Sequence, residues 1–262
     1  KKILSAAASV ELLHNASLIH DDIVDQAEIR RGLKSANRIW GDHATVLVGD
    51  FLLARSLFLI NKCKSSKVMG SVTNAASELA NGQILDIMIS KRLVTFNQDI
   101  YFKMIKLKTA SLISSSAEVG ALLSTTDIAK VRKLKLYGTN LGISYQLIDD
   151  ALDLLGDSSK MGKHTMEDIK EGKVTLPMLI ALDKAPYNDK KVILKILQKK
   201  NFDRKNLDIL YNFVLENNAV EETLQFASNY SSKAILAIES LNESKYKDSL
   251  IALAKENIVR VS

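Results

Sequence analysis

The 262-residue sequence predicts an all-α fold, and two observations support that prediction. It contains only 2 prolines and 11 glycines, whereas a sandwich or barrel needs turns rich in both residue types at intervals of roughly 8–12 residues. Apolar residues instead recur every three or four positions along nearly the whole chain, as between Val46 and Leu57, which is the period of a helix with one buried face. The chain is therefore expected to be helical throughout.

Taken in order, the same periodicity predicts a helix in each segment that lacks helix breakers. These helices are expected at 1–27, 43–63, 66–91, 97–107, 109–124, 127–155, 173–184, 189–199, 204–216, 219–240 and 244–258. Two longer connections, 28–43 and 156–173, are basic and punctuated by glycine. No linker or change in composition divides the chain, so residues 1–262 are expected to form a single domain. Because the sequence starts without Met inside a helical pattern, we expect the full protein to have a further N-terminal segment.

Composition also limits the classes of protein to consider. Cys63 is the only cysteine, which excludes an internal disulfide framework and a multi-cysteine metal site and fits a reducing cytoplasm. No uncharged apolar run approaches the roughly 18 residues of a membrane span, so stable membrane insertion is not expected. The net charge is +6, but the acidic residues cluster where they would repel a phosphate backbone, and no nucleic-acid-binding motif is present. Nucleic acid is therefore not an expected partner.

Two aspartate clusters with the spacing D-D-x-x-D carry the functional argument. Their members are Asp21, Asp22 and Asp25 in the first cluster and Asp149, Asp150 and Asp153 in the second. Each cluster interrupts an apolar helix and precedes one of the two basic connections. Carboxylates four residues apart share a helix face and repel each other unless something neutralises them. Mg²⁺ can do so, because it binds through one or two carboxylates together with waters and substrate phosphates. The clusters therefore predict magnesium ions around a diphosphate.

The side chains around the clusters suit a diphosphate ester with an apolar tail. His14 and Ser17 extend the polar stripe of the first cluster backwards along its helix, and Gln146 lies one turn before the second. Arginine binds phosphate with two parallel hydrogen bonds and lysine acts as a mobile charge. The candidate phosphate-binding cations are Arg30, Arg31, Lys108, Lys163 and Lys173.

These motifs resemble those of the trans-isoprenyl diphosphate synthases, also called polyprenyl diphosphate synthases. The resemblance covers residues 14–177 in the family's order. Besides the aspartate motifs it includes Arg30-Arg31-Gly32, Gly49-Asp50-Phe51-Leu52, Gly82-Gln83, Lys108-Thr109 and Glu171-Gly-Lys-Val-Thr-Leu-Pro177. It implies the isoprenoid synthase-type fold, an antiparallel helical bundle around a central cavity whose mouth carries the two aspartate motifs. A cytoplasmic homodimer is expected.

The resemblance also implies a role for each matching residue. Three Mg²⁺ would be bound directly by Asp21, Asp25 and Asp149, and the other three aspartates would act through waters or neighbouring ligands. Arg30 would contact the allylic diphosphate, and Arg31 with His14 the isopentenyl diphosphate. The rest of the allylic site would comprise Lys108, Thr109, Gln146, Lys163 and Lys173. The six aspartates and Lys108 would be the catalytic residues.

In the implied reaction, the metal ions and the cationic side chains stabilise the departing diphosphate of the allylic substrate. The double bond of isopentenyl diphosphate attacks the resulting carbocation, head to tail and in trans geometry, and a proton is lost to the released diphosphate. No side-chain base is needed. Two assignments stay open: His14 also fits a core histidine, and Gln83 and Asp86 fit helix packing as well as a site.

Small residues before the first cluster predict a long product. Short-chain members of the family commonly place an aromatic side chain four or five residues before the motif, where this sequence has Ser17 and Ala16, with Leu13 one turn further back. The uninterrupted first motif is similar to that of long-chain bacterial enzymes. Since the helix rises roughly 22 Å from Asp21 to Ala6, we expect an octaprenyl-type product of about C40 for a quinone side chain. A farnesyl or geranylgeranyl product is the alternative.

Three other classes match less well. A terpene cyclase normally has an Asn/Ser/Glu-type second metal motif, head-to-head condensing enzymes have sparser Asp motifs, and a non-catalytic subunit of a heteromeric synthase should lose its aspartates. The sequence departs from the family pattern twice. It does not include the family's N-terminal Gly-Gly-Lys-x-x-Arg-Pro segment, and Met166 stands where the family usually has glycine, which affects the expected placement of Lys163.

Overall fold

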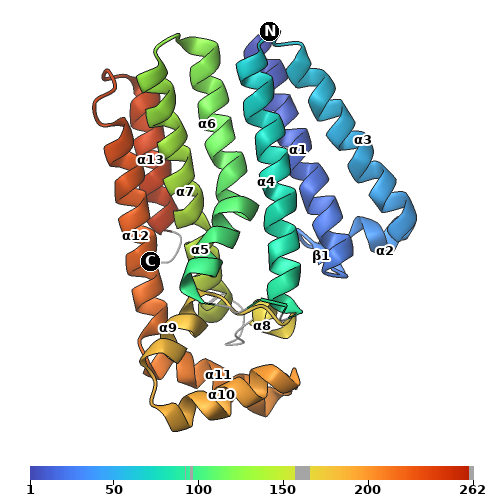
Figure 1. Cartoon of the computed structure of the whole chain (residues 1–262), viewed down its shortest axis with the longest axis vertical. Helices are drawn as coiled ribbons and strands as arrows, with labels where there is room; N and C mark the ends of the chain where they lie inside the picture. Colours follow the sequence, from blue (N-terminus) through green and yellow to red (C-terminus); the bar gives the residue numbers. More distant parts are fainter. Residues whose placement is uncertain (92, 95–96, 157–165, 260–262) are drawn as a thin grey trace. The chain divides into compact units, whose positions relative to one another are not determined.

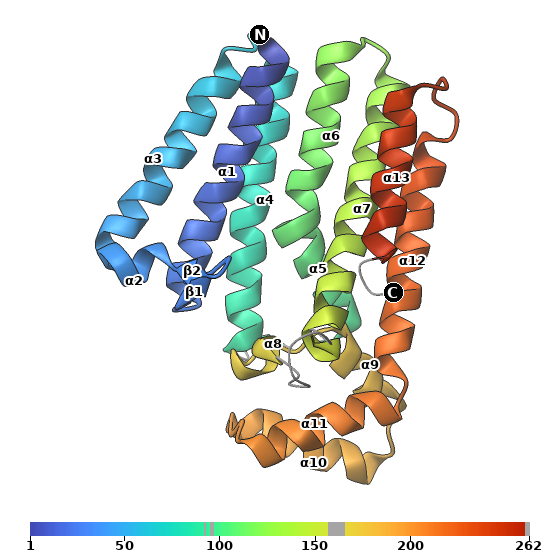
Figure 2. The ribbon, with the colours of Figure 1, turned by 180° about the vertical axis from the view of Figure 1, so that it is seen from behind.

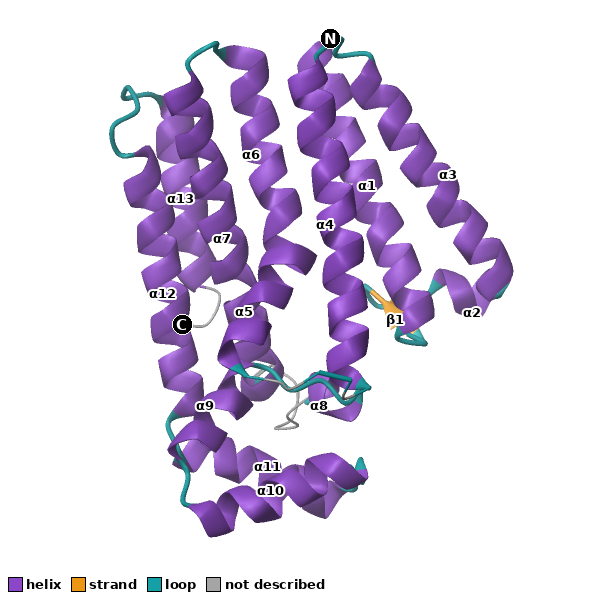
Figure 3. Cartoon of the chain, in the orientation of Figure 1, coloured by secondary structure: helices purple, strands orange, loops and turns teal. Residues whose placement is uncertain are grey.

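The computed structural model describes residues 1–262 apart from 92, 95–96, 157–165 and 260–262, and the described chain is almost entirely helical (Figure 1). Its α-helices are α1 (Lys2–Val24), α2 (Ala36–Trp40), α3 (Asp42–Asn61), α4 (Ser66–Ser90), α5 (Gln98–Ile105), α6 (Ser111–Ser124), α7 (Ile128–Leu155), α8 (Glu167–Lys170), α9 (Leu176–Lys184), α10 (Tyr187–Lys199), α11 (Arg204–Glu216), α12 (Ala219–Ile238) and α13 (Lys245–Val259). A π-helical turn, η1 (Lys106–Ala110), and the strands β1 (Ile29–Arg30) and β2 (Leu33–Lys34) complete the regular structure of this part of the chain. Figure 3 shows the same predominance of helix, so the predicted all-α class is confirmed.

The basic connection after the first aspartate cluster is more regular than expected. The prediction of a loop over 28–43 is wrong, because this segment forms the β1–β2 hairpin and α2. The strands are antiparallel, with Arg30 opposite Leu33. Between them, Arg31 and Gly32 have φ values of 52° and 78°, and a two-residue type I′ turn requires positive φ at both positions. Strands of two residues are too short to produce an alternating pattern, so periodicity could not predict them.

The expected break between helices 97–107 and 109–124 is also wrong. In the structure α5, η1 and α6 follow one another without a gap. A π-helical turn has a longer repeat than an α-helix and shifts the apolar pattern, which explains why the sequence suggested two separate helices. Such turns frequently occur at functional sites, and this one carries Lys108 and Thr109.

The second basic connection differs from the prediction at its end. It contains the single-turn helix α8, which was not expected, and α9 begins at Leu176 instead of residue 173. Pro177 occupies the first turn of α9, where its missing N–H costs no hydrogen bond and its fixed φ suits the helix. Proline therefore sets the later start.

The helices form two compact units. Unit 1 comprises Lys1–Gln83 and Leu107–Thr139, and unit 2 comprises Ile84–Lys106 and Asn140–Ser262. Both α4 and α7 contribute residues to each unit. The first aspartate cluster belongs to unit 1 and the second to unit 2. The expectation that residues 1–262 form one domain stays a prediction.

In unit 1, α1 and α3 lie antiparallel and side by side in both views of the ribbon (Figures 1 and 2). They approach closely because small residues lie at their contact: Ser9 Oγ donates to the Ser56 carbonyl and Ser56 Oγ to the Ser9 carbonyl, each at 2.8 Å. The apolar core of the unit comprises Ala6, Leu13, Ile60, Cys63, Val68, Val72, Ala75, Leu112 and Val119. Cys63 is fully buried in this core.

Several large apolar side chains of α3 point outward, although Ile60 belongs to the apolar core. Its buried residues include Thr45 and Ser56, whereas Leu47, Phe51 and Phe58 are 69%, 62% and 50% exposed. Large apolar side chains gathered on an exposed helix face generally indicate an interaction surface. We refer to Leu47, Phe51 and Phe58 as the α3 outer face.

By length and composition, α3 is the one described helix that could cross a membrane, and 22% of its apolar window is buried. Asp50 and Arg55 lie within the apolar sequence of this helix, so the sequence contains no long uncharged apolar run there. Such charges are costly inside a bilayer.

In unit 2, buried polar side chains connect α7 with α12 and α13. Ser144 Oγ donates to the Ala227 carbonyl at 2.8 Å, and Asn257 Nδ2 donates to Ser144 Oγ at 3.1 Å. At the end of α12, the buried ammonium of Lys247 donates to the carbonyls of Glu239 and Leu241 at 2.6 and 3.0 Å. These bonds satisfy carbonyls of the C-cap residue and of the connection between α12 and α13. The helix that carries the second aspartate cluster is thereby held in a well-connected unit.

Candidate active site

The first aspartate cluster lies at the end of α1, and its members point in different directions. Asp22 is 3% exposed, whereas Asp21 and Asp25 are only partly buried. At about 100° per residue, Asp21 and Asp25 lie about 40° apart around the helix and Asp22 about 100° from Asp21. The last turn of α1 contains no basic residue, although the helix dipole is already negative there. The cluster therefore requires cations from other elements.

Arg30 provides one of these cations, to the buried member of the cluster. Its Nε donates to Asp22 Oδ1 at 2.8 Å, and its Nη2 donates to the same oxygen. This hydrogen bonding raises the pKa of Arg30 above its ordinary value. Asn37 Nδ2 donates to the Asp22 backbone carbonyl at 3.3 Å. The hairpin that follows α1 is therefore hydrogen-bonded to the cluster through Arg30, the residue predicted to contact the allylic diphosphate.

Lys108 provides a second cation, to the partly buried face. Its Nζ lies 3.4 Å from Asp21 Oδ1, which brings together two residues that are far apart in the sequence and that were both predicted to belong to the site. The π-helical turn that carries Lys108 packs closely on α4 at Gly82. A Cβ at Gly82 would lie 2.5 Å from the Lys108 backbone nitrogen, so only glycine fits at this point.

The second aspartate cluster, on α7, repeats the burial pattern of the first. Asp150 is 2% exposed, and Asp149 and Asp153 are partly buried. The phenol of Tyr101 on α5 donates to Asp150 Oδ2, and Gln146 Nε2 donates to Asp150 Oδ1 at 2.8 Å. Burial raises the pKa of Asp150, and burial followed by the charge of Asp150 raises the pKa of Tyr101 well above its ordinary value. Gln146 thus contacts the cluster, and Tyr101 is a residue that sequence reasoning missed.

Asp153 connects the cluster to the second basic connection. Its Oδ1 accepts from the Glu167 backbone N–H at 2.9 Å and its Oδ2 from the Asp168 N–H at 3.3 Å. These are orphan donors in the first turn of α8, which a carboxylate can cap. Asp153 therefore has a local structural role in this unit.

Asp168 is a further carboxylate of this neighbourhood that the sequence analysis did not identify. Burial, followed by the charges of Asp150 and Asp153, raises its pKa to about 8, while Lys173 acts in the opposite direction. Lys173 Nζ also lies 2.7 Å from Glu171 Oε2. The only sequence signal for Asp168 was its place in the second basic connection, three residues before the Glu171-Gly-Lys motif.

The backbone at Met166 has a conformation that few side chains tolerate. It adopts φ 43° and ψ 34°, the left-handed region, which glycine occupies without cost and other residues rarely adopt. Its side chain is nevertheless buried. Where the family usually has glycine, this chain therefore has a residue with a strained backbone and a buried side chain. Lys163, whose placement this difference affects, lies outside the described residues.

The remaining predicted residues of unit 1 divide between two sides of α1. His14 and Ser17 lie on the side of Asp21, as the polar stripe predicted, and Ser17 Oγ donates to the His14 carbonyl at 2.8 Å. Around the axis of α1, Ala16 instead lies close to Ser9 and His20, which both contact α3. His20 Nε2 lies 3.2 Å from the Val46 carbonyl of that helix. We therefore place Ala16 on the α3 side of the helix. Leu13, on the boundary between these sides, belongs to the apolar core.

The other predicted residues vary in burial. Arg31 lies exposed at the tip of the hairpin turn, and Thr109 is partly buried on η1. Asp86 is buried, which agrees with either of its interpretations. Gln83 Nε2 is buried and has no hydrogen-bond partner among the residues that the structure describes. A buried donor without a partner is costly, so Gln83 suits an oxygen ligand and the site interpretation gains support.

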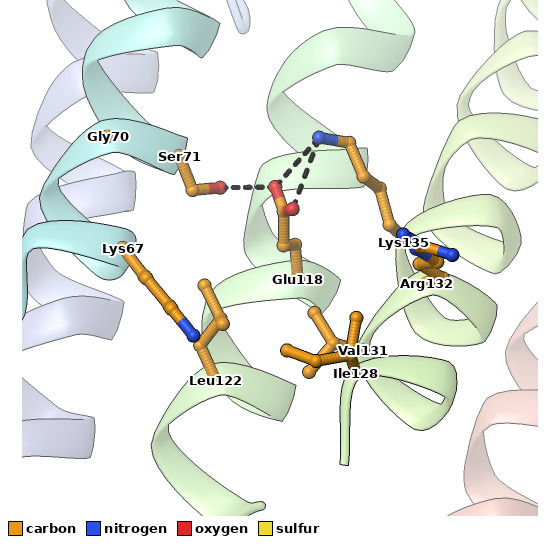
Figure 4. Close-up of a pocket in the computed structure, with 9 residues that line it drawn as sticks. All are labelled: Lys67, Gly70, Ser71, Glu118, Leu122, Ile128, Val131, Arg132 and Lys135. Carbon is orange, nitrogen blue, oxygen red and sulfur yellow. Dashed lines mark hydrogen bonds and ion pairs between the residues drawn. The ribbon is translucent and has the colours of Figure 1, made fainter. Parts of the chain in front are cut away.

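A separate hollow of about 380 Å³ lies between α4, α6 and α7 in unit 1 (Figure 4). Glu118 accepts from Ser71 Oγ at 2.7 Å and pairs with Lys135 at 3.0 Å. Lys67 and Arg132 add cations, and Leu122, Ile128 and Val131 add apolar surface. None of the residues predicted to form the active site lines this hollow. This hollow is therefore separate from the predicted site residues of unit 1.

Comparison with known proteins shows to which family this chain belongs. The model of the polyprenyl synthetase family matches residues 1–214. The chain belongs to the polyprenyl synthetase family. It is 33% identical over 257 residues to octaprenyl diphosphate synthase of Haemophilus influenzae, covering 98% of this chain and 78% of that protein. It is 34% identical over 250 residues to geranylgeranyl diphosphate synthase of Saccharolobus solfataricus, covering 93% and 74%.

A solved member of the polyprenyl synthetase family has the same fold. This polyprenyl synthase from Caulobacter crescentus, complexed with calcium and isoprenyl diphosphate, superposes with a TM-score of 0.91 at 34% identity, covering 98% of this chain and 78% of that one. The predicted isoprenoid synthase-type fold and the predicted enzyme class, a trans-prenyltransferase, are confirmed. Because these relatives include both a long-chain and a shorter-chain synthase, family membership does not fix the product length.

Proposed function

We propose that this chain condenses an allylic diphosphate with successive isopentenyl diphosphates, head to tail and in trans geometry, to a polyprenyl diphosphate of about C40. The observation that carries the proposal is the repeated arrangement of the aspartate clusters. In each, the middle carboxylate is buried and held by protein donors, and the outer two are partly exposed. Quinone side-chain synthesis is the expected use of such a product.

The chemistry of the donor set fits Mg²⁺. Mg²⁺ needs only one or two protein carboxylates, because it completes its shell with waters and substrate phosphates. We expect Asp21, Asp25 and Asp149 to bind the ions, three per active site. When bound, Mg²⁺ would stabilise the negative charge of the departing diphosphate. The calcium in the Caulobacter crescentus relative agrees with a site for hard divalent cations.

The cationic side chains would then bind and orient the two substrates. We assign Lys108, Thr109, Gln146, Lys163 and Lys173 to the allylic substrate, and His14 and Arg31 to isopentenyl diphosphate. Arg30, tied to Asp22, would contact the allylic diphosphate from the hairpin. Lys108 lies beside Asp21, where it can stabilise charge on the leaving group as well as the carboxylate.

The proposed long product depends on small side chains along the Asp21 side of α1. Ser17 lies on this side, four residues before the cluster, and has no aromatic ring to stop a growing tail. The octaprenyl synthase relative agrees with a long product, and the geranylgeranyl synthase relative favours the shorter alternative.

We also propose that the protein is a cytoplasmic homodimer that uses the α3 outer face. Its exposed leucine and phenylalanine side chains would be covered by the same face of a second copy, since two-fold interfaces are self-complementary. Phe51→Glu would place two charges in that interface. We expect the wild type to elute as a dimer and the variant as a monomer in size-exclusion chromatography with light scattering. A wild-type monomer would contradict the proposal.

Product chromatography tests the proposed reaction. The wild type would be incubated with radiolabelled isopentenyl diphosphate, Mg²⁺ and either a farnesyl or a geranylgeranyl primer, and the dephosphorylated products would be separated by chain length. A main product near C40 is expected. Products that stop at C15 or C20 would establish the shorter-chain alternative, and no incorporation with any primer would favour a non-catalytic subunit.

A further inference from the structure

The middle aspartate of each cluster is held by a side chain from outside its own helix. Asp22 accepts from Arg30 of β1, and Asp150 accepts from Tyr101 of α5. Both carboxylates are nearly fully buried, at 3% and 2% exposure. Metal binding by the outer aspartates does not by itself require either arrangement. Arg30 already has a proposed role at the substrate, but Tyr101 has none.

Tyr101 is suited to holding Asp150 in one orientation. Its side chain is fully buried, so its hydroxyl cannot replace the hydrogen bond to Asp150 with one to bulk water. The hydroxyl donates to Asp150 Oδ2, and Gln146 donates to Oδ1 at 2.8 Å. Each oxygen of this buried carboxylate therefore has a donor. Gln146 lies one turn away on the same helix, whereas Tyr101 connects α7 to α5.

The direction of Asp150 fixes the direction of its neighbour. Asp149 lies about 100° from Asp150 around α7, so a carboxylate anchored inside unit 2 turns Asp149 toward the partly exposed side. Removing the Tyr101 hydroxyl would leave one oxygen of a buried carboxylate without its donor, which is costly. The last turns of α7 could relieve that cost by rotating or opening, and either movement would displace Asp149.

We propose that Tyr101 is a positioning residue of the second aspartate cluster: its hydroxyl anchors Asp150 within unit 2 and thereby holds Asp149 in the orientation for metal binding. The proposal rests on the proposed function only in assigning a metal ion to Asp149. It makes Asp150 an anchor and Asp149 a ligand. A tyrosine that merely fills the core would have no effect on the metal.

The test compares Tyr101→Phe with Tyr137→Phe, which removes a hydroxyl from another buried tyrosine, three turns before the cluster on α7. Mn²⁺ binding in the presence of inorganic diphosphate would be followed by the loss of the free-ion electron paramagnetic resonance signal. We expect the Mn²⁺ dissociation constant to rise about tenfold in Tyr101→Phe, equivalent to about 1.4 kcal/mol, and less than twofold in Tyr137→Phe. Hydrogen exchange of the amides at 146–153 should accelerate in Tyr101→Phe alone.

Kinetics provide a second readout. In Tyr101→Phe, kcat should fall and the Mg²⁺ concentration for half-maximal rate should rise about tenfold, with the KM for isopentenyl diphosphate changed less than twofold. An unchanged metal affinity, or equal losses in both tyrosine variants, would overturn the proposal. If the wild type makes no product, the proposed function fails, while the hydrogen-exchange comparison still decides whether Tyr101 anchors α7.

A second pair of variants keeps the proposal falsifiable if Tyr101→Phe does not fold. Asp150→Asn retains an oxygen that can accept from Tyr101, whereas Asp149→Asn removes the ligand charge. We expect the Mn²⁺ dissociation constant to rise less than about fivefold in Asp150→Asn and more than about a hundredfold in Asp149→Asn. Equal losses would show that Asp150 is itself a ligand, and the anchoring role of Tyr101 would be wrong.

Discussion

Replacing Gly82 with alanine should displace Lys108 without touching it chemically. A Cβ at this position would lie 2.5 Å from the Lys108 nitrogen, 2.7 Å from its Cα and 2.9 Å from the Leu107 carbonyl carbon. Optimal contacts between such atoms are about 3.5–4.0 Å, so the π-helical turn must move by about 1 Å. Backbone cannot swing aside as a flexible side chain does. The contact of Lys108 with Asp21, at 3.4 Å, would be lost.

The expected cost in stability is small and the expected cost in turnover is large. Overpacking costs about 1–3 kcal/mol, and alanine recovers about 1 kcal/mol over glycine within a helix. The net loss of about 0–2 kcal/mol should lower Tm by at most about 8 °C. Misplacement of a catalytic group by about 1 Å can reduce the rate about a hundredfold. Gly82→Ala should therefore fold and lose about two orders of magnitude in turnover.

Two other glycines provide matched controls. Gly70 lies on the same helix with nothing within 4 Å of its hypothetical Cβ, and a Cβ at Gly138 would lie 2.7 Å from the Ile113 carbonyl oxygen and the Ser114 Cα. Gly70→Ala should gain about 0.4–1 kcal/mol with unchanged activity. Gly138→Ala should lose stability as Gly82→Ala does, yet keep turnover within about threefold.

The assay combines thermal unfolding with initial rates of labelled isopentenyl diphosphate incorporation at saturating Mg²⁺. If Gly82→Ala retained wild-type turnover, the close packing would not position Lys108. If Gly138→Ala lost turnover equally, the effect would come from packing in general, and the reasoning would be refuted.

Three further predictions concern single residues. Ser17→Phe should shorten the products, as measured by chain-length chromatography, because Ser17 lies on the Asp21 side of α1. Ala16→Tyr should mainly reduce stability, by about 1–3 kcal/mol. The reverse outcome would show that the growing tail follows the other side of the helix. In EDTA, the free energy of unfolding should fall as pH rises from about 4 to about 8, because Asp168 has a raised pKa in the folded protein and binds its proton more tightly there. In urea titrations, the free energy of unfolding of Asp168→Asn should depend less on pH than that of the wild type. An equal pH dependence in both proteins would exclude this cause. Met166→Gly should be more stable than Met166→Ala by about 1 kcal/mol in urea unfolding, the reverse of the usual order, because only glycine relieves the left-handed backbone.

The sequence predicted those features that repeat along a helix. The apolar period located nearly all of the long helices, and the D-D-x-x-D spacing located both aspartate clusters. The Arg-Gly pair at 31–32 is the only local signal of the hairpin, and two-residue strands are too short to give a period. The π-helical turn was read as a gap because it shifts the phase of the apolar pattern around Lys108.

Contacts between distant segments could not be predicted in the same way. Tyr101 and Asp150 are separated by 49 residues, and nothing in the sequence near Tyr101 indicates its partner. The burial of Asp22 and Asp150 similarly depends on which side of each helix faces the core. Asp168 was missed because its raised pKa results from burial and from charges on another helix. Local patterns identified the outer carboxylates, and tertiary contacts determine how the middle ones are held.

The central claim is that both aspartate clusters act in one metal-dependent step, and a double-mutant comparison tests it most directly. Initial rates of labelled isopentenyl diphosphate incorporation would be measured for the wild type, Asp21→Asn, Asp149→Asn and the double variant, at saturating Mg²⁺ and in EDTA. Groups that act as a unit are strongly non-additive. We predict Mg²⁺-dependent wild-type activity, a loss of about a thousandfold or more in each single variant, and little further loss in the double variant. Wild-type rates in either single variant, or losses that simply multiply in the double variant, would contradict the account.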